Sequence, residues 1–264
     1  VQFLGVVDYV DEHYEESIPE DLKRVLEGAA AGANAYFYAH PEHVWNKKML
    51  PVKPQDFVVG MMLGTALMGG VQGTVEKMVD GRIQNDVPKA EDGIGSNAYA
   101  FNSNKTADGN TYLAVNAHQP IEGLLSWYEA HVCSEEGWNM VGGLFHGSPT
   151  VYLGTNENLG WGHTTGNLDE LDVFKLKMHP KKKHRYSVDG KWHKLEKKRA
   201  KLKVALGKNG WFKITVGKKF WISMYGPTLE NEHGFFSLRM PALMNIYPVV
   251  QWFRMNKARN FTEF

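Results

Sequence analysis

Ser96 directly follows Gly95, and this pair carries the clearest chemical potential in the chain. The residues before it, from about 80 to 95, have no apolar period and are rich in turn formers, so we expect an exposed loop. If that loop were cut before Ser96, the serine hydroxyl could act as a nucleophile and its new α-amine as the base. An α-amine titrates near pH ~8, which suits a general base at neutral pH. A Gly-Ser pair also fits an ordinary turn, and both interpretations stay open at this point.

Other side chains with chemical potential have less specific patterns. A Ser-His-Asp hydrolase could use Ser148 or Ser96, but the chain has no Gly-x-Ser-x-Gly sequence, which counts against that mechanism. Three histidines, His131, His146 and His163, could be considered as zinc ligands. Their spacing fits no common zinc site, so we expect ordinary hydrogen-bonded histidines.

The composition is that of a globular protein. In 264 residues, 22% are charged and 12% aromatic, which allows one large domain or two small ones and argues against disorder. The single cysteine, Cys133, excludes an internal disulfide. The chain opens Val1-Gln2-Phe3 without the pattern of a signal peptide, and no apolar run approaches transmembrane length, so we expect no membrane span.

A net charge of +1 conceals an uneven distribution. Residues 175–219 hold 17 Lys and Arg against two acidic residues, a local net charge of +15, and the rest of the chain carries −14. Such a segment could bind nucleic acid or an anionic membrane. It could equally be the solvated face of twisted hairpins, where lysine protects edge strands. Because no recognition motif accompanies the charge, we favour the second interpretation and expect no nucleic-acid partner.

Helical patterns precede Ser96. Residues 17–20 (Ser-Ile-Pro-Glu) have the spacing of a capping box, with Ser17 at the N-cap and Glu20 at the third helical position. Apolar residues then recur at helical spacing over residues 22–37. A second helical stretch is expected from about residue 54 to 79, apolar almost all round at its centre, which indicates burial between layers.

After Ser96 the hydrophobic period shortens to that of strands, at residues 111–117, 151–154 and 173–178. Asp189-Gly190 and Asn209-Gly210, each between alternating runs, predict tight hairpins. The tail from about residue 245 to 264 is again helical in pattern. Helices followed by a largely antiparallel sheet region predict an α+β protein.

Several blocks of sequence follow one another in a distinctive order. They are Gly95-Ser96-Asn97-Ala98-Tyr99-Ala100-Phe101, Leu113-Ala114-Val115-Asn116-Ala117-His118, Gly147-Ser148-Pro149-Thr150-Val151, Gly160-Trp161-Gly162-His163-Thr164-Thr165, Asp169-Glu170-Leu171-Asp172-Val173-Phe174 and, upstream, Pro51-Val52-Lys53-Pro54-Gln55-Asp56. In order and spacing they resemble the penicillin acylases and acyl-homoserine-lactone acylases, which are N-terminal-nucleophile hydrolases. The resemblance runs nearly end to end. It covers the second half of an α-subunit and the start of a β-subunit.

That resemblance implies a fold and an activity. The fold would be part of the α-β-β-α sandwich of N-terminal-nucleophile hydrolases, with the nucleophile strand central. The chain would divide into a helical α-subunit part at 1–80, a spacer loop at 81–95 and a β-subunit part at 96–264. The protein would be a self-processing hydrolase of a small-molecule N-acyl amide, an α/β heterodimer matured from one precursor. By the same resemblance it would be periplasmic or extracellular.

The resemblance also implies catalytic roles. Ser96 would be the nucleophile, freed by cleavage after Gly95, and His118 would hold the serine and its amine in place. A core histidine at a strand end is the alternative for His118. Thr165 would supply a backbone N–H to the oxyanion hole. The family's second oxyanion donor, an asparagine side chain, falls beyond Phe264, and loss of one such donor typically costs on the order of 100- to 1,000-fold in rate. An inactive truncated or non-catalytic calcium-stabilised domain is therefore a rival interpretation.

A structural calcium ion is implied by the same comparison. The family's calcium loop corresponds to Asp169, Asp172 and the carbonyl of Leu171, and its α-subunit glutamate corresponds to Glu76. Hard oxygen ligands from separate segments suit Ca²⁺. Acidic residues at a strand start with no ion are the alternative.

The acyl pocket is assigned in the same way. The matching positions include side chains smaller than the aromatic residues of phenylacetyl-selective members, so the resemblance implies a longer or different acyl group. These positions are Ala66, Gly70, Gln119 and Leu153.

Overall fold

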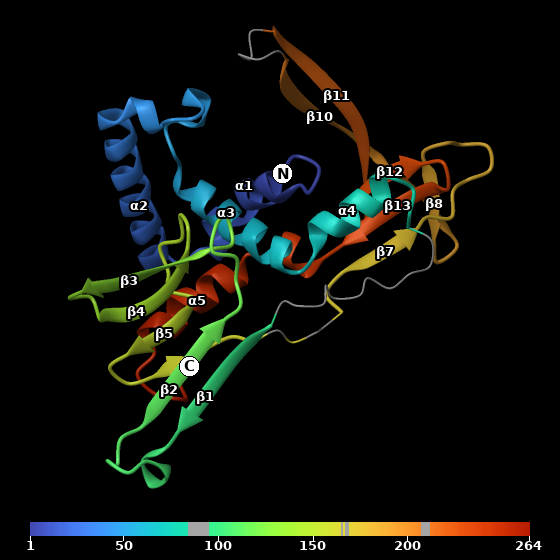
Figure 1. The fold of residues 1–264 in the computed structure, drawn as a ribbon. Helices are drawn as coiled ribbons and strands as arrows, with labels where there is room; N and C mark the ends of the chain where they lie inside the picture. Colours follow the sequence, from blue (N-terminus) through green and yellow to red (C-terminus); the bar gives the residue numbers. More distant parts are fainter. Residues whose placement is uncertain (84–94, 165, 167–168, 207–211) are drawn as a thin grey trace. The chain divides into compact units, whose positions relative to one another are not determined.

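The computed structural model describes residues 1–83, 95–164, 166, 169–206 and 212–264, and it has the expected mixture of helices and antiparallel strands (Figure 1). The chain forms two compact units. The first comprises Val1–Val7, Gly69–Lys89 and Asp169–Met244, and the second comprises Asp8–Met68, Ala90–Leu168 and Asn245–Phe264. We describe each unit by itself.

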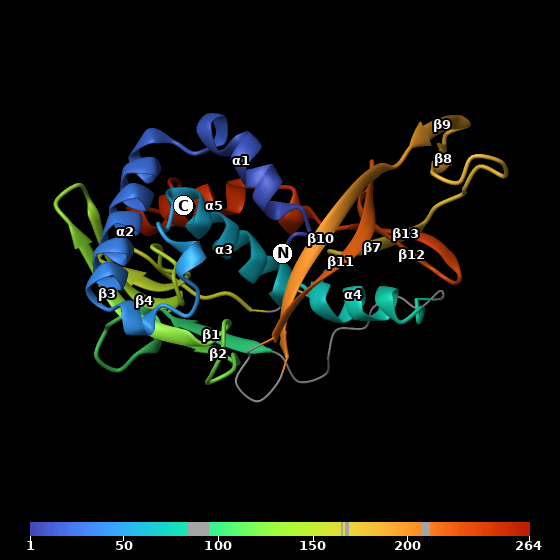
Figure 2. The same cartoon turned by 90° about the horizontal axis from the view of Figure 1, so that it is seen from above.

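The first unit is built on a five-stranded antiparallel sheet. Its strand order is β10 (Glu196–Leu206), β11 (Phe212–Ser223), β12 (Gly226–Asn231), β13 (Gly234–Arg239) and β7 (Asp172–Lys175). Because β11 pairs with β12 only over its last three residues, the remainder of β10 and β11 extends as a long two-stranded ribbon (Figure 2). Helix α4 (Val71–Val79) lies beside β12, where the Asn231 side-chain amide donates to the carbonyl of Met78 at 3.2 Å.

The core of the first unit is aromatic and aliphatic. Five buried residues form its centre, namely Leu176, Tyr186, Leu195, Trp221 and Phe235. The buried phenol of Tyr186 accepts a hydrogen bond from the backbone N–H of Met224 at 2.8 Å, so its polar atom is satisfied. Tyr186 belongs to β8 (Arg185–Val188), which pairs with β9 (Lys191–Lys194) in a hairpin.

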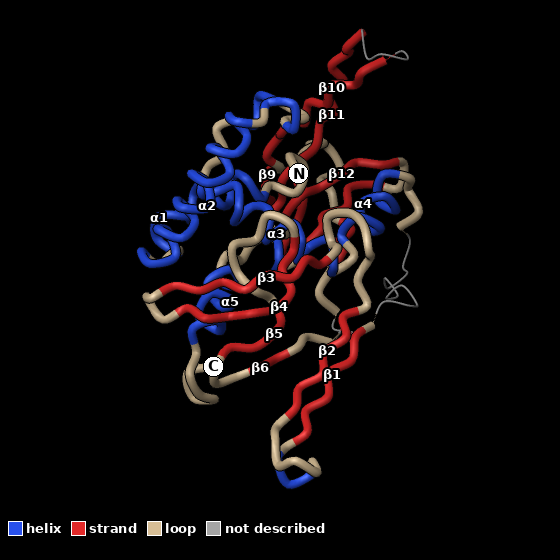
Figure 3. Tube along the Cα trace, turned by 60° about the vertical axis from the view of Figure 1, so that its left-hand side comes forward, coloured by secondary structure: helices blue, strands red, loops and turns tan. Residues whose placement is uncertain are grey.

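The second unit combines helices with two small sheets (Figure 3). The four-stranded antiparallel sheet runs in the order β3 (Trp127–Ser134), β4 (Trp138–Phe145), β5 (Leu153–Asn156) and β6 (Gly160–Trp161). A separate antiparallel ribbon joins β1 (Ser96–Phe101) to β2 (Tyr112–Ala117). The helices are α1 (Val6–Ser17), most of which lies in this unit, α2 (Glu20–Ala39), α3 (Pro54–Met68) and α5 (Tyr247–Lys257).

Helix α5 is tied to the segment just before β5 by the side chain of Asn256, which is 1% exposed. Its amide donates to the carbonyl of Val151 at 2.7 Å, and the backbone N–H of Val151 donates back to its Oδ1 at 3.0 Å. On the helix's outer side Arg254 forms an ion pair with Asp21 of α2 at 2.6 Å. One helix thus connects the sheet to the helical layer.

Two helical predictions need correction. Ser17 is the last residue of α1, a helix that the sequence pattern did not predict, and Pro19 takes the N-cap of α2 without a side-chain cap. The capping box is therefore wrong, because the serine already belongs to the preceding helix. The single helix expected over residues 54–79 is two helices, since Gly70 adopts a left-handed conformation (φ 78°) that ends the helical path.

Other predictions are confirmed. Asp189 (φ 48°) and Gly190 (φ 78°) form the tight turn between β8 and β9, which is the geometry that Asp-Gly favours. Strand β2 forms where the sequence placed it, and helix α5 forms within the predicted tail but ends at Lys257, short of the expected end near residue 264. The turn expected at Asn209-Gly210 lies outside the described residues, although β10 and β11 on either side pair as expected.

The position of β1 differs from the expectation. The resemblance implied a central nucleophile strand, whereas within the described ranges β1 pairs with β2 alone. In the part of the chain that the structure describes, no single helix is long and apolar enough to cross a membrane, and α3 and α4 pass that test only together as a bent pair.

Candidate active site

Strand register brings Ser96 and His118 together. Ser96 is the first residue of β1 and pairs with Ala117, the last residue of β2. His118 follows Ala117 directly, so it lies next to the serine although 22 residues separate them in sequence. Two of the three residues that the sequence analysis assigned to catalysis are therefore neighbours.

The hydroxyl of Ser96 faces the peptide bond that would be cut. Its Oγ donates a hydrogen bond to the carbonyl oxygen of Gly95 at 2.6 Å. The backbone N–H of His118 donates to the same oxygen at 3.1 Å and lies 3.4 Å from Oγ. A carbonyl that receives two hydrogen bonds is polarised, and a donor in that position can stabilise negative charge on the oxygen.

The ring of His118 also lies against Gly95. A side-chain carbon placed on Gly95 would be 3.5 Å from Nδ1 of the ring. The amide of Asn116 donates to Nε2 at 3.2 Å, so as assigned the ring proton is on Nδ1. Because the ring is exposed, the core-histidine alternative does not describe it.

Strand β6 and the residue after it lie against the ribbon that carries Ser96 and Ala117. A side-chain carbon on Gly160 would lie 2.6 Å from Leu113, and one on Gly162 would lie 2.7 Å from Val115. Both partners are on β2, so glycine permits the close approach at these two positions. Thr165, three residues further on, lies outside the described residues.

His163, between these glycines and Thr165, is held by α5. The indole N–H of Trp252 donates to its Nε2 at 3.0 Å. Burial lowers the pKa of His163, and hydrogen bonding to the carbonyl of Tyr152 offsets part of that effect. The ring is therefore favoured in its neutral form.

The residues assigned to calcium all belong to the first unit. Glu76 is on α4, where its carboxylate accepts a hydrogen bond from Gln72 at 3.0 Å. Asp172 opens β7, while Asp169 is exposed just before it. In the described ranges the oxygens of these three carboxylates are not all within 4.8 Å of one another. As placed, they do not form a coordination shell, and calcium stays a prediction.

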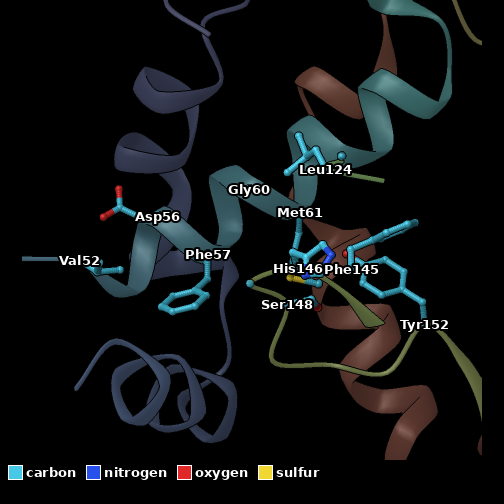
Figure 4. Close-up of a pocket in the computed structure, with 12 residues that line it drawn as sticks. Val52, Asp56, Phe57, Gly60, Met61, Leu124, Phe145, His146, Ser148 and Tyr152 are labelled. Carbon is cyan, nitrogen blue, oxygen red and sulfur yellow. The ribbon is translucent and has the colours of Figure 1, made fainter. Parts of the chain in front are cut away.

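A cavity of about 230 Å³ opens between α3 and the β4–β5 region of the second unit (Figure 4). Its lining is largely apolar, with the side chain of Phe57 on one side and those of Phe145 and Tyr152 on another. The full lining is Val52, Asp56, Phe57, Gly60, Met61, Gly64, Leu124, Phe145, His146, Gly147, Ser148 and Tyr152. The sequence pattern does not predict this cavity, because helix α3 is apolar almost all round and no one face of it is marked as a lining.

The four positions assigned to the acyl pocket do not line this cavity. Ala66 is fully buried in α3, and Gln119 and Leu153 are half-buried. Gly70 belongs to the first unit, at the start of α4. Their role in substrate binding stays a prediction.

Ser148 is engaged in local structure. It is 8% exposed, and its hydroxyl donates to the carbonyl of Thr150 at 3.0 Å. Among the described contacts it has no histidine partner, so it lacks the base that a Ser-His-Asp mechanism needs. His146 hydrogen-bonds to Ser126 at 2.9 Å and His131 to Asn139 at 2.7 Å, as expected of structural histidines.

Comparison with known proteins gives a consistent result. The family model for penicillin amidase matches residues 1–264. An acyl-homoserine lactone acylase PvdQ of Pseudomonas fluorescens (strain Pf0-1) is 24% identical over 291 residues, covering 99% of this chain and 37% of the relative. The corresponding protein of strain Pf-5 is 29% identical over 171 residues, covering 62% of this chain and 22% of the relative.

Among solved structures, a thermostable penicillin G acylase from Alcaligenes faecalis matches 52% of this chain and 24% of its own, with 24% identity and a TM-score of 0.44. The chain thus spans well under half the length of the proteins it matches.

The lowered pKa of His163 predicts a pH effect on stability. In the unfolded chain His163 binds a proton near pH ~6.5, whereas in the folded chain its pKa is lower. The contribution of the neutral ring is therefore complete above pH ~6.5 and is lost as the pH falls toward the lower, folded pKa. His163→Gln should show a shallower fall in the free energy of unfolding between about pH 6.5 and pH 5 than the wild type. Urea unfolding across this range measures it, with His233→Gln as the control histidine substitution in the other unit. Equal slopes in wild type and His163→Gln would contradict it.

Proposed function

The chain belongs to the penicillin amidase family, and from this premise we propose that the protein is a self-processing N-acyl amide hydrolase with Ser96 as its nucleophile. One observation carries the proposal. The Ser96 hydroxyl donates to the Gly95 carbonyl, and the backbone N–H of His118 donates to that same oxygen. An ordinary turn would not need both of these hydrogen bonds on the Gly95 carbonyl, whereas cleavage of the bond after Gly95 would use them.

The first reaction in this proposal is on the protein's own chain. Ser96 Oγ attacks the carbonyl carbon of Gly95, its proton passes to the Ser96 nitrogen, and the His118 N–H stabilises the negative charge on the oxygen. The C–N bond between Gly95 and Ser96 then breaks, leaving an ester and a free α-amine on Ser96. Water hydrolyses the ester to a Gly95 carboxylate and restores the hydroxyl. No atom beyond one water molecule is needed.

The second reaction uses the new N-terminus. The α-amine accepts the proton of Ser96 Oγ as the hydroxyl attacks the substrate amide, and the amine of the substrate leaves with a proton. An acyl ester on Ser96 is then hydrolysed by water. The chemistry requires no redox or organic cofactor. The backbone N–H of Thr165 would bind the oxyanion, together with the downstream asparagine of the family.

The proposal extends to the fold of the whole protein. In the α-β-β-α sandwich, β1 would be a central strand, with further residues pairing along its free edge. The exposed side chains of Tyr99 and Phe101 on β1 support this, since large apolar residues on a ribbon are normally covered. Processing would yield an α/β heterodimer, in a periplasmic or extracellular location by family resemblance.

The substrate class that fits best is an amide joining an aliphatic acyl chain to a polar amine. Two of the relatives are named for acting on acyl-homoserine lactones, in which an acyl group is joined to a polar amine. The cavity of the second unit, with its apolar lining, has room for an acyl chain. An inactive or non-catalytic calcium-stabilised domain is the competing hypothesis, and self-cleavage separates the two.

Substitution of Ser96 tests self-cleavage. The full-length protein should mature into two fragments that meet at Gly95 and Ser96, whereas Ser96→Ala should remain a single chain because no nucleophile is present at that bond. Intact-mass measurement after expression shows which occurs. Ser103→Ala, at an exposed serine in the connection between β1 and β2, should mature normally. Maturation of Ser96→Ala at the same bond without added protease would reject the mechanism.

The acyl preference is tested with a series of chromogenic amides from acetyl to dodecanoyl, together with phenylacetyl. Each added CH₂ that is buried contributes roughly 0.8 kcal/mol, so kcat/KM should rise with chain length until the pocket is filled. Aliphatic groups should exceed phenylacetyl. A flat profile, or a maximum at phenylacetyl, would refute the preference. No turnover by correctly cut protein would refute the acylase assignment itself.

Calcium binding by Glu76, Asp169, Asp172 and the Leu171 carbonyl is a further part of the proposal, in which the ion would draw these groups together. An ion that binds only the native state stabilises it by about 2.7 kcal/mol at a hundredfold excess over Kd. The melting temperature should therefore fall when a chelator is added and recover with Ca²⁺. The double variant Asp169→Asn, Asp172→Asn should not respond. Equal melting temperatures of the wild-type protein with and without chelator would argue against the ion.

A further inference from the structure

Two histidines and a glutamate cluster where helix α2 ends. His40, Glu42 and His43 present ligand atoms that all lie within 4.8 Å of one another. We propose that these three side chains bind a divalent d-block cation, of which Zn²⁺ is the natural probe. The cluster has no part in the candidate active site, and the proposal does not depend on the acylase activity. The sequence analysis did not single it out.

The backbone places the three residues on one turn. The N–H of His40 donates to the Tyr36 carbonyl at 2.8 Å and closes helix α2, after which His40 leaves helical geometry (φ −126°, ψ 64°). Pro41 then begins the short 3₁₀ helix Pro41–His43, and the N–H of His43 donates to the His40 carbonyl at 3.0 Å. This segment is the turn that follows α2 in Figure 1. Residues two and three positions after His40 therefore fold back beside it.

The distances suit a small tetrahedral ion. His40 Nδ1 lies 3.3 Å from Glu42 Oε1, and His43 Nε2 lies 3.9 Å from the same oxygen. Bonds of about 2.0–2.1 Å to Zn²⁺ in tetrahedral geometry place neighbouring ligand atoms roughly 3.3–3.4 Å apart. The first distance already matches, and the second would have to shorten by about half an ångström.

A tyrosine orients one of the histidines. The hydroxyl of Tyr36 is 2.8 Å from Nδ1 of His43, on the opposite side of the ring from the nitrogen that faces Glu42. When Nδ1–H donates to that hydroxyl, Nε2 carries the lone pair and faces the cluster. Histidines that bind metals commonly have such a partner on the other nitrogen, which fixes the tautomer and the ring orientation.

Ring stacking restricts the cluster further. Tyr36 lies 4.6 Å from His40 between ring centroids, and the two histidine rings are nearly parallel at 5.5 Å. Since the side chains are already gathered, binding a cation costs less conformational entropy than it would for three independent side chains. The arrangement is thus more than an accidental proximity of exposed polar groups.

The donor set selects the kind of metal. Two imidazole nitrogens and one carboxylate suit zinc and its d-block neighbours, whereas calcium and magnesium prefer oxygen ligands throughout. All three side chains are about half exposed, between 46% and 62%, so water can complete the coordination. The site therefore differs in metal preference from the oxygen ligands Glu76, Asp169 and Asp172.

The competing explanation is a plain histidine–glutamate hydrogen bond. The chain contains a matched example of that in His233 and Glu232, whose side chains are 3.4 Å apart. In the described part of the chain this pair does not belong to a group of three candidate ligands. The pair His233–Glu232 therefore supplies the control for the experiment.

The test is calorimetric titration of the purified full-length protein with ZnCl₂ in a buffer that does not chelate zinc. The variants are His40→Gln, His43→Gln and Tyr36→Phe, with His233→Gln as the control, and their melting temperatures without metal report correct folding. The wild type and the control should each bind one equivalent of Zn²⁺. His40→Gln and His43→Gln should not bind it. Tyr36→Phe should retain that equivalent with about 10-fold weaker affinity. Excess Ca²⁺ should not displace it.

Absence of that equivalent in the wild type, or its persistence in His43→Gln, would overturn the proposal. If the histidine variants fail to fold, Co²⁺ titration of the wild type decides instead. Four-coordinate Co²⁺ with nitrogen and oxygen ligands absorbs far more intensely in the visible range than six-coordinate Co²⁺. That absorption should develop with one equivalent and disappear when Zn²⁺ is added, and its absence would equally overturn the site.

Discussion

Ser96 pairs with Ala117 across the β1–β2 ribbon, and the contacts of His118 with Gly95 and Ser96 follow from that register. Side chains alternate between the two faces of a strand, so a slip of one residue would turn the Ser96 hydroxyl to the opposite face. It would also remove the His118 N–H from the Gly95 carbonyl. Two-stranded ribbons are marginally stable alone. The ribbon therefore needs support from the rest of the second unit to hold the geometry of the site.

That support comes from glycines and from one buried amide. Gly160 and Gly162 let the β6 segment approach Leu113 and Val115 of β2 more closely than any side chain would allow. The β6 segment is in turn paired with β5, whose neighbour Val151 is clamped by Asn256 of α5. Because Asn256 satisfies both backbone groups of Val151 in a buried setting, its loss would leave two polar groups unpaired. Helix α5 thus helps to fix the β5–β6 region, and that region in turn supports the β1–β2 ribbon that carries Ser96.

Local chemistry explains which features could be predicted from sequence. Asp189-Gly190 was predictable because its positive φ angles are a property of the two residues themselves. The N-terminus of α2 was not, since a serine can cap one helix or end another, and only packing decides between them. Ser96 was found from the loop before it and His118 through family resemblance. The His40, Glu42 and His43 cluster was missed because it arises from a helix end and a proline turn, which no ligand spacing describes.

The state of the Ser96 nitrogen imposes an order on the proposed chemistry. While Gly95 and Ser96 are joined, that nitrogen is an amide whose lone pair is delocalised into the carbonyl, so it cannot accept a proton as a base. The hydroxyl meanwhile donates to the Gly95 carbonyl and is directed at its own chain rather than outward. Among the described contacts of the joined chain, only the Gly95 carbonyl accepts hydrogen bonds from both the Ser96 hydroxyl and the His118 N–H. The arrangement therefore favours cleavage of the chain first, and only the product of that cleavage has the free amine that turnover of another amide requires.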